Sequence, residues 1–257
     1  MSRIIAFANQ KGGVGKTTTT VNLAAYLAAK GKKVLVIDMD SQGNTTSGLG
    51  QNKSQQENTV YELMIGECSI AEAILHDVIK NVDLIPANAN LAAVEVEMIG
   101  IDKKDYILKN QVEYVSEQYD FILMDCPPAL NTATLNALTT ANGVMITVQC
   151  EYLALEGLGE LLKTITLVKE RMNDQLKIDG ILFTMYDSRT SLSMQVVENV
   201  TEKLNGLYHI YDTKIPRNVR LAEAPSFGMP ICMYDDKSAG AEAYRKLADE
   251  VLNRKDV

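Results

Sequence analysis

A glycine-rich loop between an apolar run and a helix-length segment is the feature that most constrains this chain. Residues 10–20 read QKGGVGKTTTT and follow the apolar run RIIAFAN at 3–9. The run predicts a strand, and TTTTVNLAAYLAAKG at 17–31 predicts a helix that ends at the C-capping candidate Gly31. Glycines at such a junction let successive backbone N–H groups turn toward one point, where the helix N-terminus adds positive potential. The stretch therefore predicts a phosphate-binding loop.

Short β-branched runs and helix-length segments alternate along the rest of the chain. Strands are predicted at 3–9, 33–39, 82–87, 120–126, 143–149, 178–185 and 213–215. Several of these runs are apolar throughout, as expected of strands that are buried on both faces of a parallel sheet. Helical segments such as 155–173 lie between them, and right-handed crossovers then give a doubly wound sheet. We predict a single α/β domain over residues 1–257, with seven or eight mostly parallel strands and helices on both faces.

Composition narrows the class of protein further. The 257 residues are 46% hydrophobic, which is ample for a buried core. There is no run of 18 apolar residues and no signal peptide, so a cytoplasmic protein without a membrane segment is expected. The polar, glycine-rich stretch 43–60 predicts a surface loop. The cysteines are widely spaced, which favours small core side chains over a zinc site or a disulfide framework, and they are Cys68, Cys126, Cys150 and Cys232.

The charge distribution bears on nucleic-acid binding. The net charge of −8 argues against a chain that coats nucleic acid constitutively, because such binding depends on Lys and Arg. Residues 1–159 hold 11 Lys and Arg against 18 Asp and Glu, a net of −7, whereas residues 160–257 hold 14 against 15, a net of −1. The last hundred residues therefore have room for a local basic face.

The end of the loop carries the residues that phosphate chemistry needs. The ordinary pattern G-x-x-x-x-G-K-[ST] fails at its first position, which is Gln10 here. Gly15, Lys16 and Thr17 nevertheless match its end and stand between a strand and a helix. Lys16 is expected to reach the β and γ phosphates of a nucleotide, and the Thr17 hydroxyl is expected to bind Mg²⁺.

The block KGGVGKTT resembles the deviant Walker A motif of the ParA/MinD family of P-loop ATPases. The resemblance implies that ATP and Mg²⁺ are bound and that two ATP-loaded subunits face each other. In the family the first lysine, Lys11 here, is the signature and reaches the partner's nucleotide, so Lys11 and Lys16 would both be catalytic. The nucleotide-binding residues implied by the block are Lys11, Gly12, Gly13, Val14, Gly15, Lys16, Thr17 and Thr18.

Three aspartates at strand ends complete the expected site. Asp38 and Asp40 lie in VIDMDSQGN at the end of the second predicted strand, where side chains at i and i+2 point the same way. The resemblance implies that Asp40 positions the attacking water and that Asp38 supports the metal, whereas the alternative is that both only cap the strand. Asp125 ends the apolar run FILMDCPP, a Walker B arrangement. The expected metal residues are thus Thr17, Asp38 and Asp125.

Three later blocks extend the resemblance over nearly the whole chain and narrow it to partition ATPases of the ParA/Soj type. They are QCEYLALEGL (149–158), TMYDSRT (184–190) and IPRNVRLAEAPSFGMPI (215–231). In that group Pro216, Arg217 and Asn218 would lie against the adenine. The alternative is a strand-to-helix turn in which Asn218 is the N-cap, and both can hold at once.

Basic residues of the C-terminal half would bind DNA without sequence preference. The resemblance assigns Arg189, Arg217 and Arg220 to this surface. Three residues of the last segment are weaker candidates, since charges on a helix usually face solvent, and they are Lys246, Arg254 and Lys255. Relatives often have proline and a basic residue where this chain has Asp236 and Ala239, so its hold on DNA is expected to be weaker.

The resemblance implies a slow, partner-stimulated ATPase that dimerises with ATP, associates with the nucleoid and drives chromosome or plasmid partitioning with a ParB-type protein. The alternative is a MinD-like or other positioning ATPase of the same family, acting on a membrane or on a cargo other than DNA. A membrane-binding helix needs bulky apolar residues opposite lysines. The tail 241–257 instead has Tyr244, Leu247, Val251 and Leu252 at helical spacing with mixed charges on the other side, which predicts a packing helix. An iron–sulfur carrier would require paired cysteines, which are absent from this sequence.

Overall fold

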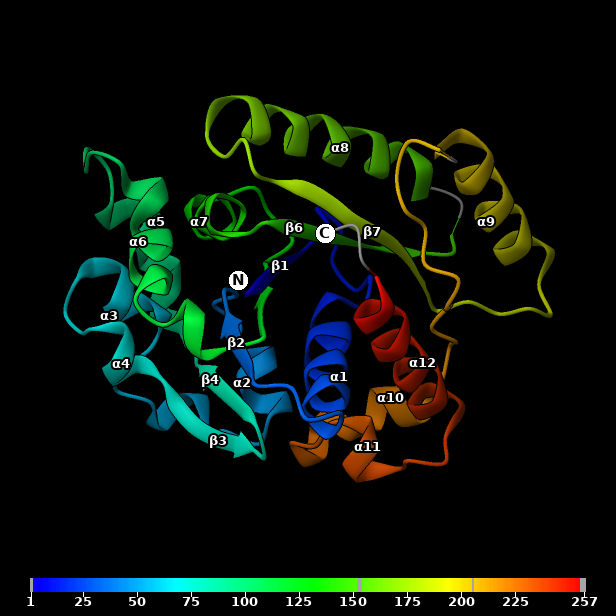
Figure 1. The fold of residues 1–257 in the computed structure, drawn as a ribbon, viewed down its shortest axis with the longest axis horizontal. Coiled ribbons are helices and arrows are strands. Elements are labelled where there is room, and N and C mark those ends of the chain that lie inside the picture. The colour runs from blue at the N-terminus through cyan, green and yellow to red at the C-terminus, as the bar shows by residue number, and fades with distance from the viewer. Residues whose placement is uncertain (1, 152–153, 205, 255–257) are drawn as a thin grey trace.

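The computed structural model describes residues 2–151, 154–204 and 206–254, which form one α/β domain around a seven-stranded sheet (Figure 1). The strand order is β3-β4-β2-β5-β1-β6-β7. β3 runs antiparallel to β4, and the other neighbours are parallel. The strands are β1 (Arg3–Ala8), β2 (Val34–Asp38), β3 (Leu75–Ile79), β4 (Val82–Ile85), β5 (Phe121–Asp125), β6 (Gly143–Gln149) and β7 (Lys177–Thr184). The predicted doubly wound, mostly parallel sheet is confirmed.

One predicted strand is wrong and one strand was missed. Residues 213–215 form no strand. The backbone N–H groups of Asp212 and Thr213 donate to the Glu250 carboxylate, and isolated bridges lie on either side of the segment, between Ile210 and Ile181 and between Pro216 and Tyr186. The missed strand is β3, an exposed edge strand with a register shift against β4. Its sequence LHDVI lacks the continuous apolar character of the buried strands, which explains why the apolar pattern did not reveal it.

Helices cover both faces of the sheet. They are α1 (Lys16–Ala29), α2 (Asn44–Gly48), α3 (Val60–Ile65), α4 (Ile70–Ala73), α5 (Val94–Glu97), α6 (Ile107–Glu113), α7 (Thr132–Thr140), α8 (Ala154–Arg171), α9 (Ser191–Leu204), α10 (Val219–Glu223), α11 (Ile231–Tyr234) and α12 (Ala239–Asn253). Short 3₁₀ helices span Lys53–Gln55, Ala89–Ala93, Lys104–Tyr106, Ser116–Gln118 and Ala224–Phe227. Gly31, just beyond α1, has a φ of +84°, the left-handed conformation expected of a C-capping glycine.

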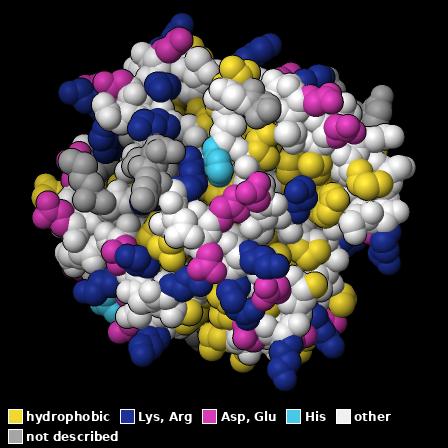
Figure 2. Space-filling model, turned by 45° about the vertical axis from the view of Figure 1, so that its right-hand side comes forward, with side chains coloured by type: hydrophobic (Ala, Val, Ile, Leu, Met, Phe, Trp, Pro, Cys, Tyr) yellow, Lys and Arg dark blue, Asp and Glu magenta, His cyan; other side chains and the backbone are white. Residues whose placement is uncertain are grey.

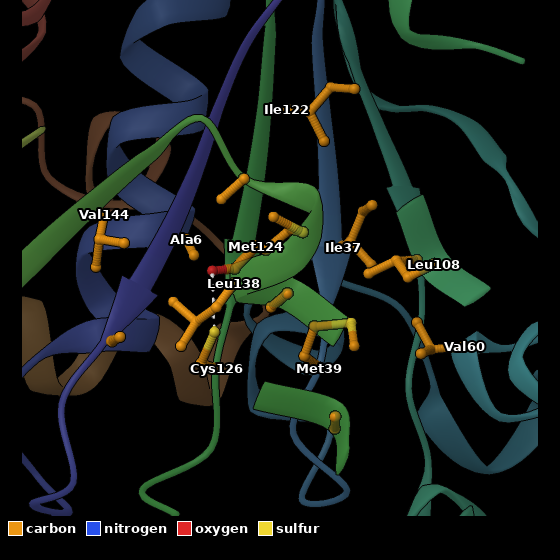
Figure 3. Packing of buried hydrophobic residues seen from close by; sticks show 14 of the residues in the cluster. Ala6, Ile37, Met39, Val60, Leu108, Ile122, Met124, Cys126, Leu138 and Val144 are labelled. Carbon is orange, nitrogen blue, oxygen red and sulfur yellow. Dashed lines mark hydrogen bonds between the residues drawn. The ribbon is translucent and has the colours of Figure 1, made fainter. Parts of the chain in front are cut away.

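The sheet separates two apolar cores. The core on one face of the sheet includes residues of α1, α10, α11 and α12, and the core on the other face includes residues of α3, α5, α6, α7, α8 and α9 (Figure 1). Figure 3 shows the second core, where Ala6 on the sheet lies near Leu138 of α7 and Ile37 lies near Leu108 of α6. Burial on both faces accounts for the continuous apolar runs in the central strands.

The C-terminal segment is a packing helix, as predicted. Tyr244, Leu247 and Val251 of α12 are buried in the same core as α1, and the Tyr244 hydroxyl lies 3.1 Å from the Thr19 hydroxyl of that helix. Within the described ranges, no helix is both long and apolar enough to cross a bilayer. Of the four free cysteines, Cys126 and Cys150 are buried, whereas Cys68 and Cys232 are half-buried at the edges of the cores.

The prediction of a surface loop at 43–60 is wrong at both ends. Thr59 and Val60 are fully buried, with α3 beginning at Val60, and the first part forms α2, in which the side chains of Thr45 and Thr46 are fully buried. Both hydroxyls donate to carboxylates at the ends of neighbouring strands, so polar composition there reflects internal hydrogen bonding and not solvation.

Candidate functional site

The glycine loop lies at the carboxyl end of β1, between that strand and the N-terminus of α1. Gly13 and Gly15 have φ values of +72° and +87°, which glycine adopts without strain. An added Cβ at Gly12 or Gly13 would meet no atom within 4 Å, so the outer side of the loop is open. The loop has the backbone shape that an anion at the helix N-terminus requires.

Lys16 turns back across the loop. Its Nζ donates to the carbonyl oxygens of Asn9 and Lys11, both at 3.0 Å, and the residue is only 6% exposed. Burial lowers the pKa of the Lys16 ammonium, although the Asp125 carboxylate opposes the shift. Because both of these partners are neutral carbonyl groups, the Lys16 ammonium keeps its charge available for the phosphate oxygens of a nucleotide.

Two side chains that the sequence analysis missed anchor the loop to the sheet. The Asn9 amide donates to the Thr147 carbonyl of β6 at 2.7 Å, and its oxygen accepts the Lys11 backbone N–H. At the other end, the Thr184 hydroxyl of β7 donates to the Val14 carbonyl at 2.9 Å. Thr184 lies next to the end of the predicted strand 178–185, so its position was a usable signal, whereas nothing local distinguished Asn9.

Asp38 and Asp125 face each other across neighbouring strands. They are register partners in β2 and β5, and both are fully buried. Burial raises the pKa of Asp38 to about 7, and the nearby Asp125 adds to the shift. Burial also raises the pKa of Asp125 to about 6, although hydrogen bonds from Thr17 and Thr45 oppose it. Two acidic groups so close together favour a cation between them or beside them.

Threonine hydroxyl groups donate hydrogen bonds to the Oδ2 atom of both Asp38 and Asp125. Asp125 Oδ2 accepts from Thr17 Oγ1 at 2.6 Å and from Thr45 Oγ1 at 2.7 Å. Asp38 Oδ2 accepts from both the backbone N–H and the hydroxyl of Thr46, at 2.8 and 2.7 Å. The sequence analysis missed Thr45 and Thr46, because their stretch had the composition of a loop.

The residues present fit a hydrated Mg²⁺ ion. Asp125 Oδ1 is buried and has no hydrogen-bond partner within the described residues. A buried carboxylate oxygen without a donor is costly unless a ligand uses it. Asp125 beside the Thr17 hydroxyl offers the hard oxygen donors that Mg²⁺ prefers, usually through retained water. Asp40 is half-buried just beyond β2, and its backbone N–H donates to Asp38 Oδ1 at 3.2 Å.

A cavity of about 210 Å³ opens beside the loop. Its walls are mostly apolar, and they are Gly15, Thr18, Thr184, Met185, Ile215, Pro216, Arg217, Asn218, Leu221, Ala222 and Tyr244. All three residues predicted to contact adenine are among them. Asn218 is also the N-cap of α10, since its Oδ1 accepts from the backbone N–H groups of Arg220 and Leu221. The N-cap interpretation therefore holds together with the position beside the cavity.

Lys11 lies at the entrance of the loop with its side chain along α8. Its Cε is 3.0 Å from the position that a Cβ on Gly157 would occupy, so the bare glycine makes room for it. Its backbone N–H is held by Asn9 and its carbonyl by Lys16. The side chain is half-buried within its own subunit in this structure.

The three arginines predicted to bind DNA are exposed, but each has a carboxylate partner. Arg189 is 87% exposed and forms a bidentate ion pair with Asp187. Arg217 lies 3.8 Å from Glu151, and Arg220 pairs with Glu223 and Asp235, at 2.9 and 3.4 Å. Figure 2 shows basic and acidic side chains interspersed over the face of the molecule that it draws.

The weaker candidates near the C-terminus differ from one another. Lys246 is exposed and lies 3.4 Å from Glu242. The prediction that Arg254 contributes to a DNA-binding surface is wrong, because its side chain is only 15% exposed and pairs with the buried Asp179. Lys255 lies outside the described residues. Asp236 accepts from the Tyr26 hydroxyl and pairs with Arg245, so it joins α1 to α12.

Known proteins resemble this chain over nearly its full length. A family model described as an AAA domain matches residues 2–178. The sporulation initiation inhibitor protein Soj of Bacillus subtilis is 50% identical over 251 residues, which are 98% of each chain. The chromosome partitioning protein ParA of Caulobacter vibrioides is 46% identical over 254 residues, covering 98% of this chain and 94% of that protein.

Among solved structures, cobyrinic acid a,c-diamide synthase from Mycobacterium smegmatis with bound ATP analog and magnesium has a TM-score of 0.86 and 36% identity. The match covers 98% of this chain and 95% of the synthase. The sheet, the loop between β1 and α1, and the extent of these matches agree, and the chain belongs to the ParA/Soj family of P-loop ATPases that partition chromosomes.

Proposed function

We propose that this protein is an ATP-dependent, dimerising ATPase that binds DNA without sequence preference and partitions chromosomes or plasmids with a ParB-type partner. One observation carries the proposal: a phosphate loop, an apolar cavity and two buried carboxylates adjoin one another at one edge of the sheet. The 50% identity to Soj favours partitioning over the other activities of this fold.

The loop and the cavity are proposed to hold ATP. The backbone N–H groups of residues 11–18 surround the phosphates, with the Lys16 ammonium on the β and γ oxygens. The base enters the cavity beside Pro216, Arg217 and Asn218. Thr17 and Asp125 hold Mg²⁺, with Asp38 supporting its water shell. When bound, the metal neutralises charge on the phosphate oxygens.

Asp40 is proposed to orient the attacking water. It lies beyond the carboxyl end of β2, within electrostatic range of both Lys16 and Asp125. If Asp40 has this role, Asp40→Ala traps an ATP-bound dimer on DNA, because the protein binds nucleotide but hydrolyses it slowly. Phosphate release by this variant at the wild-type rate would contradict the assignment.

Lys11 is proposed to act on the nucleotide of a second subunit. A cation near the bridging and γ oxygens stabilises the charge that develops in phosphoryl transfer. To reach across, the side chain must leave its place against Gly157 of α8. Hydrolysis is then slow in the monomer, and ATP favours the dimer.

DNA binding is proposed to come from Arg189, Arg217 and Arg220. Because each pairs with a carboxylate, one subunit presents a weak basic surface. A symmetric dimer presents two copies, and avidity then raises the affinity. If so, Arg189→Ala dimerises with ATP but is released from DNA at lower salt than wild type. Arg245→Ala is a matched control, since this arginine also forms ion pairs and lies outside the proposed surface. Equal salt dependence of wild type and Arg189→Ala would remove Arg189 from the surface.

The proposal is tested by sizing the protein with ATP, with ADP and without nucleotide, each with and without plain duplex DNA. A dimer that forms only with ATP and alone retains DNA is expected. A monomer in every condition would overturn the dimer mechanism. A dimer that never retains DNA would favour the alternative, a positioning ATPase that acts on a membrane or another cargo. The apolar face of α12 is buried within the domain, which disfavours a role for this helix in binding a membrane.

A further inference from the structure

Thr45 brings a buried hydroxyl to the proposed metal site from a segment outside the phosphate loop. It is the second residue of α2 and is fully buried. Its Oγ1 donates to Asp125 Oδ2 at 2.7 Å, and Thr17 Oγ1 donates to the same oxygen at 2.6 Å. Two hydroxyls from α1 and α2 therefore converge on one oxygen at the end of β5.

The two oxygens of the Asp125 carboxylate differ in their hydrogen-bond partners. Oδ2 has two donors, whereas Oδ1 is buried and has no partner within the described residues. Hydrogen bonds on Oδ2 fix the rotation of the carboxylate and so fix the direction in which Oδ1 points. Residues that orient a ligand in this way are part of how a protein sets its metal affinity.

Thr45 adds a second donor to the one that Thr17 supplies. In the proposed site the Thr17 oxygen also faces the metal, which a lone pair of that oxygen can bind while its proton remains hydrogen-bonded to Asp125. Thr45 is held independently, because its neighbour Thr46 donates twice to Asp38 and accepts the Ala87 backbone N–H at 3.0 Å. These bonds clamp α2 against the ends of β2 and β4.

We propose that Thr45 is a positioning residue for the metal: it holds Asp125 so that Oδ1 accepts from a metal-bound water. This inference rests on the proposed function of the site as a Mg²⁺–ATP site. It also makes the stretch 43–49 part of the site, because displacement of α2 would remove one of the two donors to Asp125.

The test measures metal affinity directly. Binding of a fluorescent ATP analogue is titrated with Mg²⁺ in one arm and measured in EDTA in the other, for wild type, Thr45→Val and Thr45→Ser. Valine keeps the shape and removes the donor. We expect Thr45→Val to raise the half-saturating Mg²⁺ concentration about 10- to 100-fold, the usual effect of losing an outer-shell partner. Serine keeps the donor and should stay near wild type, and binding in EDTA should be the same in all three.

Thr139→Val controls for the general effect of deleting a buried hydroxyl. Thr139 is fully buried in α7, and its hydroxyl lies 2.5 Å from the Asp105 carbonyl and 3.0 Å from the Asn136 carbonyl, either of which can accept its proton. The inference is overturned if Thr45→Val has the wild-type Mg²⁺ dependence, or if it loses binding equally in EDTA, which would indicate a structural role only. Wild-type protein that binds the analogue without any Mg²⁺ dependence would instead contradict the proposed function.

Discussion

Replacing Asp179 with alanine should destabilise this protein far more than breaking an ion pair of equal length at the surface. Asp179, in β7, is fully buried and accepts from Arg3 at 2.6 Å and from the Tyr211 hydroxyl. Arg254 lies 3.4 Å from its second oxygen. The substitution leaves two arginines, 13% and 15% exposed, without their buried partner.

The expected loss of stability depends on how buried the ion pair is and not on the N···O distance within it. Removing one member of a buried pair costs about 3–5 kcal/mol, because the remaining charge stays desolvated. The Lys30–Asp249 pair has the same 2.6 Å separation, but its side chains are 27% and 56% exposed. An exposed pair contributes about 0–1 kcal/mol. Asp249→Ala is therefore the matched control, and the two variants should differ by at least about 2 kcal/mol.

The assay is guanidinium unfolding of the nucleotide-free protein, followed by circular dichroism. The dependence of the free energy of unfolding on denaturant concentration is compared between variants, to confirm that unfolding exposes the same amount of surface in each. Asp179 lies near the amino end of β7, at the edge of the sheet opposite the phosphate loop, so ATP affinity of the folded variant should not change. Equal free energies of unfolding for Asp179→Ala and Asp249→Ala would refute the argument that burial decides the cost.

Three further outcomes are expected. Lys16→Ala should abolish binding of a fluorescent ATP analogue, because the loop loses its only buried cation among the described residues, and unchanged affinity would exclude the loop assignment. Asp38, whose pKa burial raises to about 7, contributes stability that is complete below its ordinary pKa and is lost as the pH rises toward 7. The melting temperature in EDTA should therefore fall between pH 4 and 7 less steeply in Asp38→Asn than in wild type, and parallel curves would refute this. Gly180→Ala should cost about 1–3 kcal/mol in urea unfolding, since its Cβ would lie 2.5 Å from the buried Tyr211 ring, and wild-type stability would show that the ring moves freely.

Local patterns in the sequence were sufficient for the main architecture. Continuous apolar runs marked the buried parallel strands, and the glycines with Lys16 and Thr17 marked the loop between β1 and α1. The amphipathic spacing of Tyr244, Leu247 and Val251 marked α12 as a packing helix. Each of these signals lies within a short stretch, because periodicity and backbone conformation are decided by near neighbours.

The tertiary structure alone decided which polar residues are internal. Thr45 meets Asp125 across 80 residues of sequence, and Arg3 meets Asp179 across 176. Arg254 resembles a solvated helix charge until the fold brings it to Asp179. No local pattern encodes such pairs, because burial of a hydroxyl or a charge depends on the partner that the distant strand supplies. The sequence by itself determined the buried parallel strands and the position of the loop, and only the packed sheet determined which oxygen of Asp125 is left for a ligand.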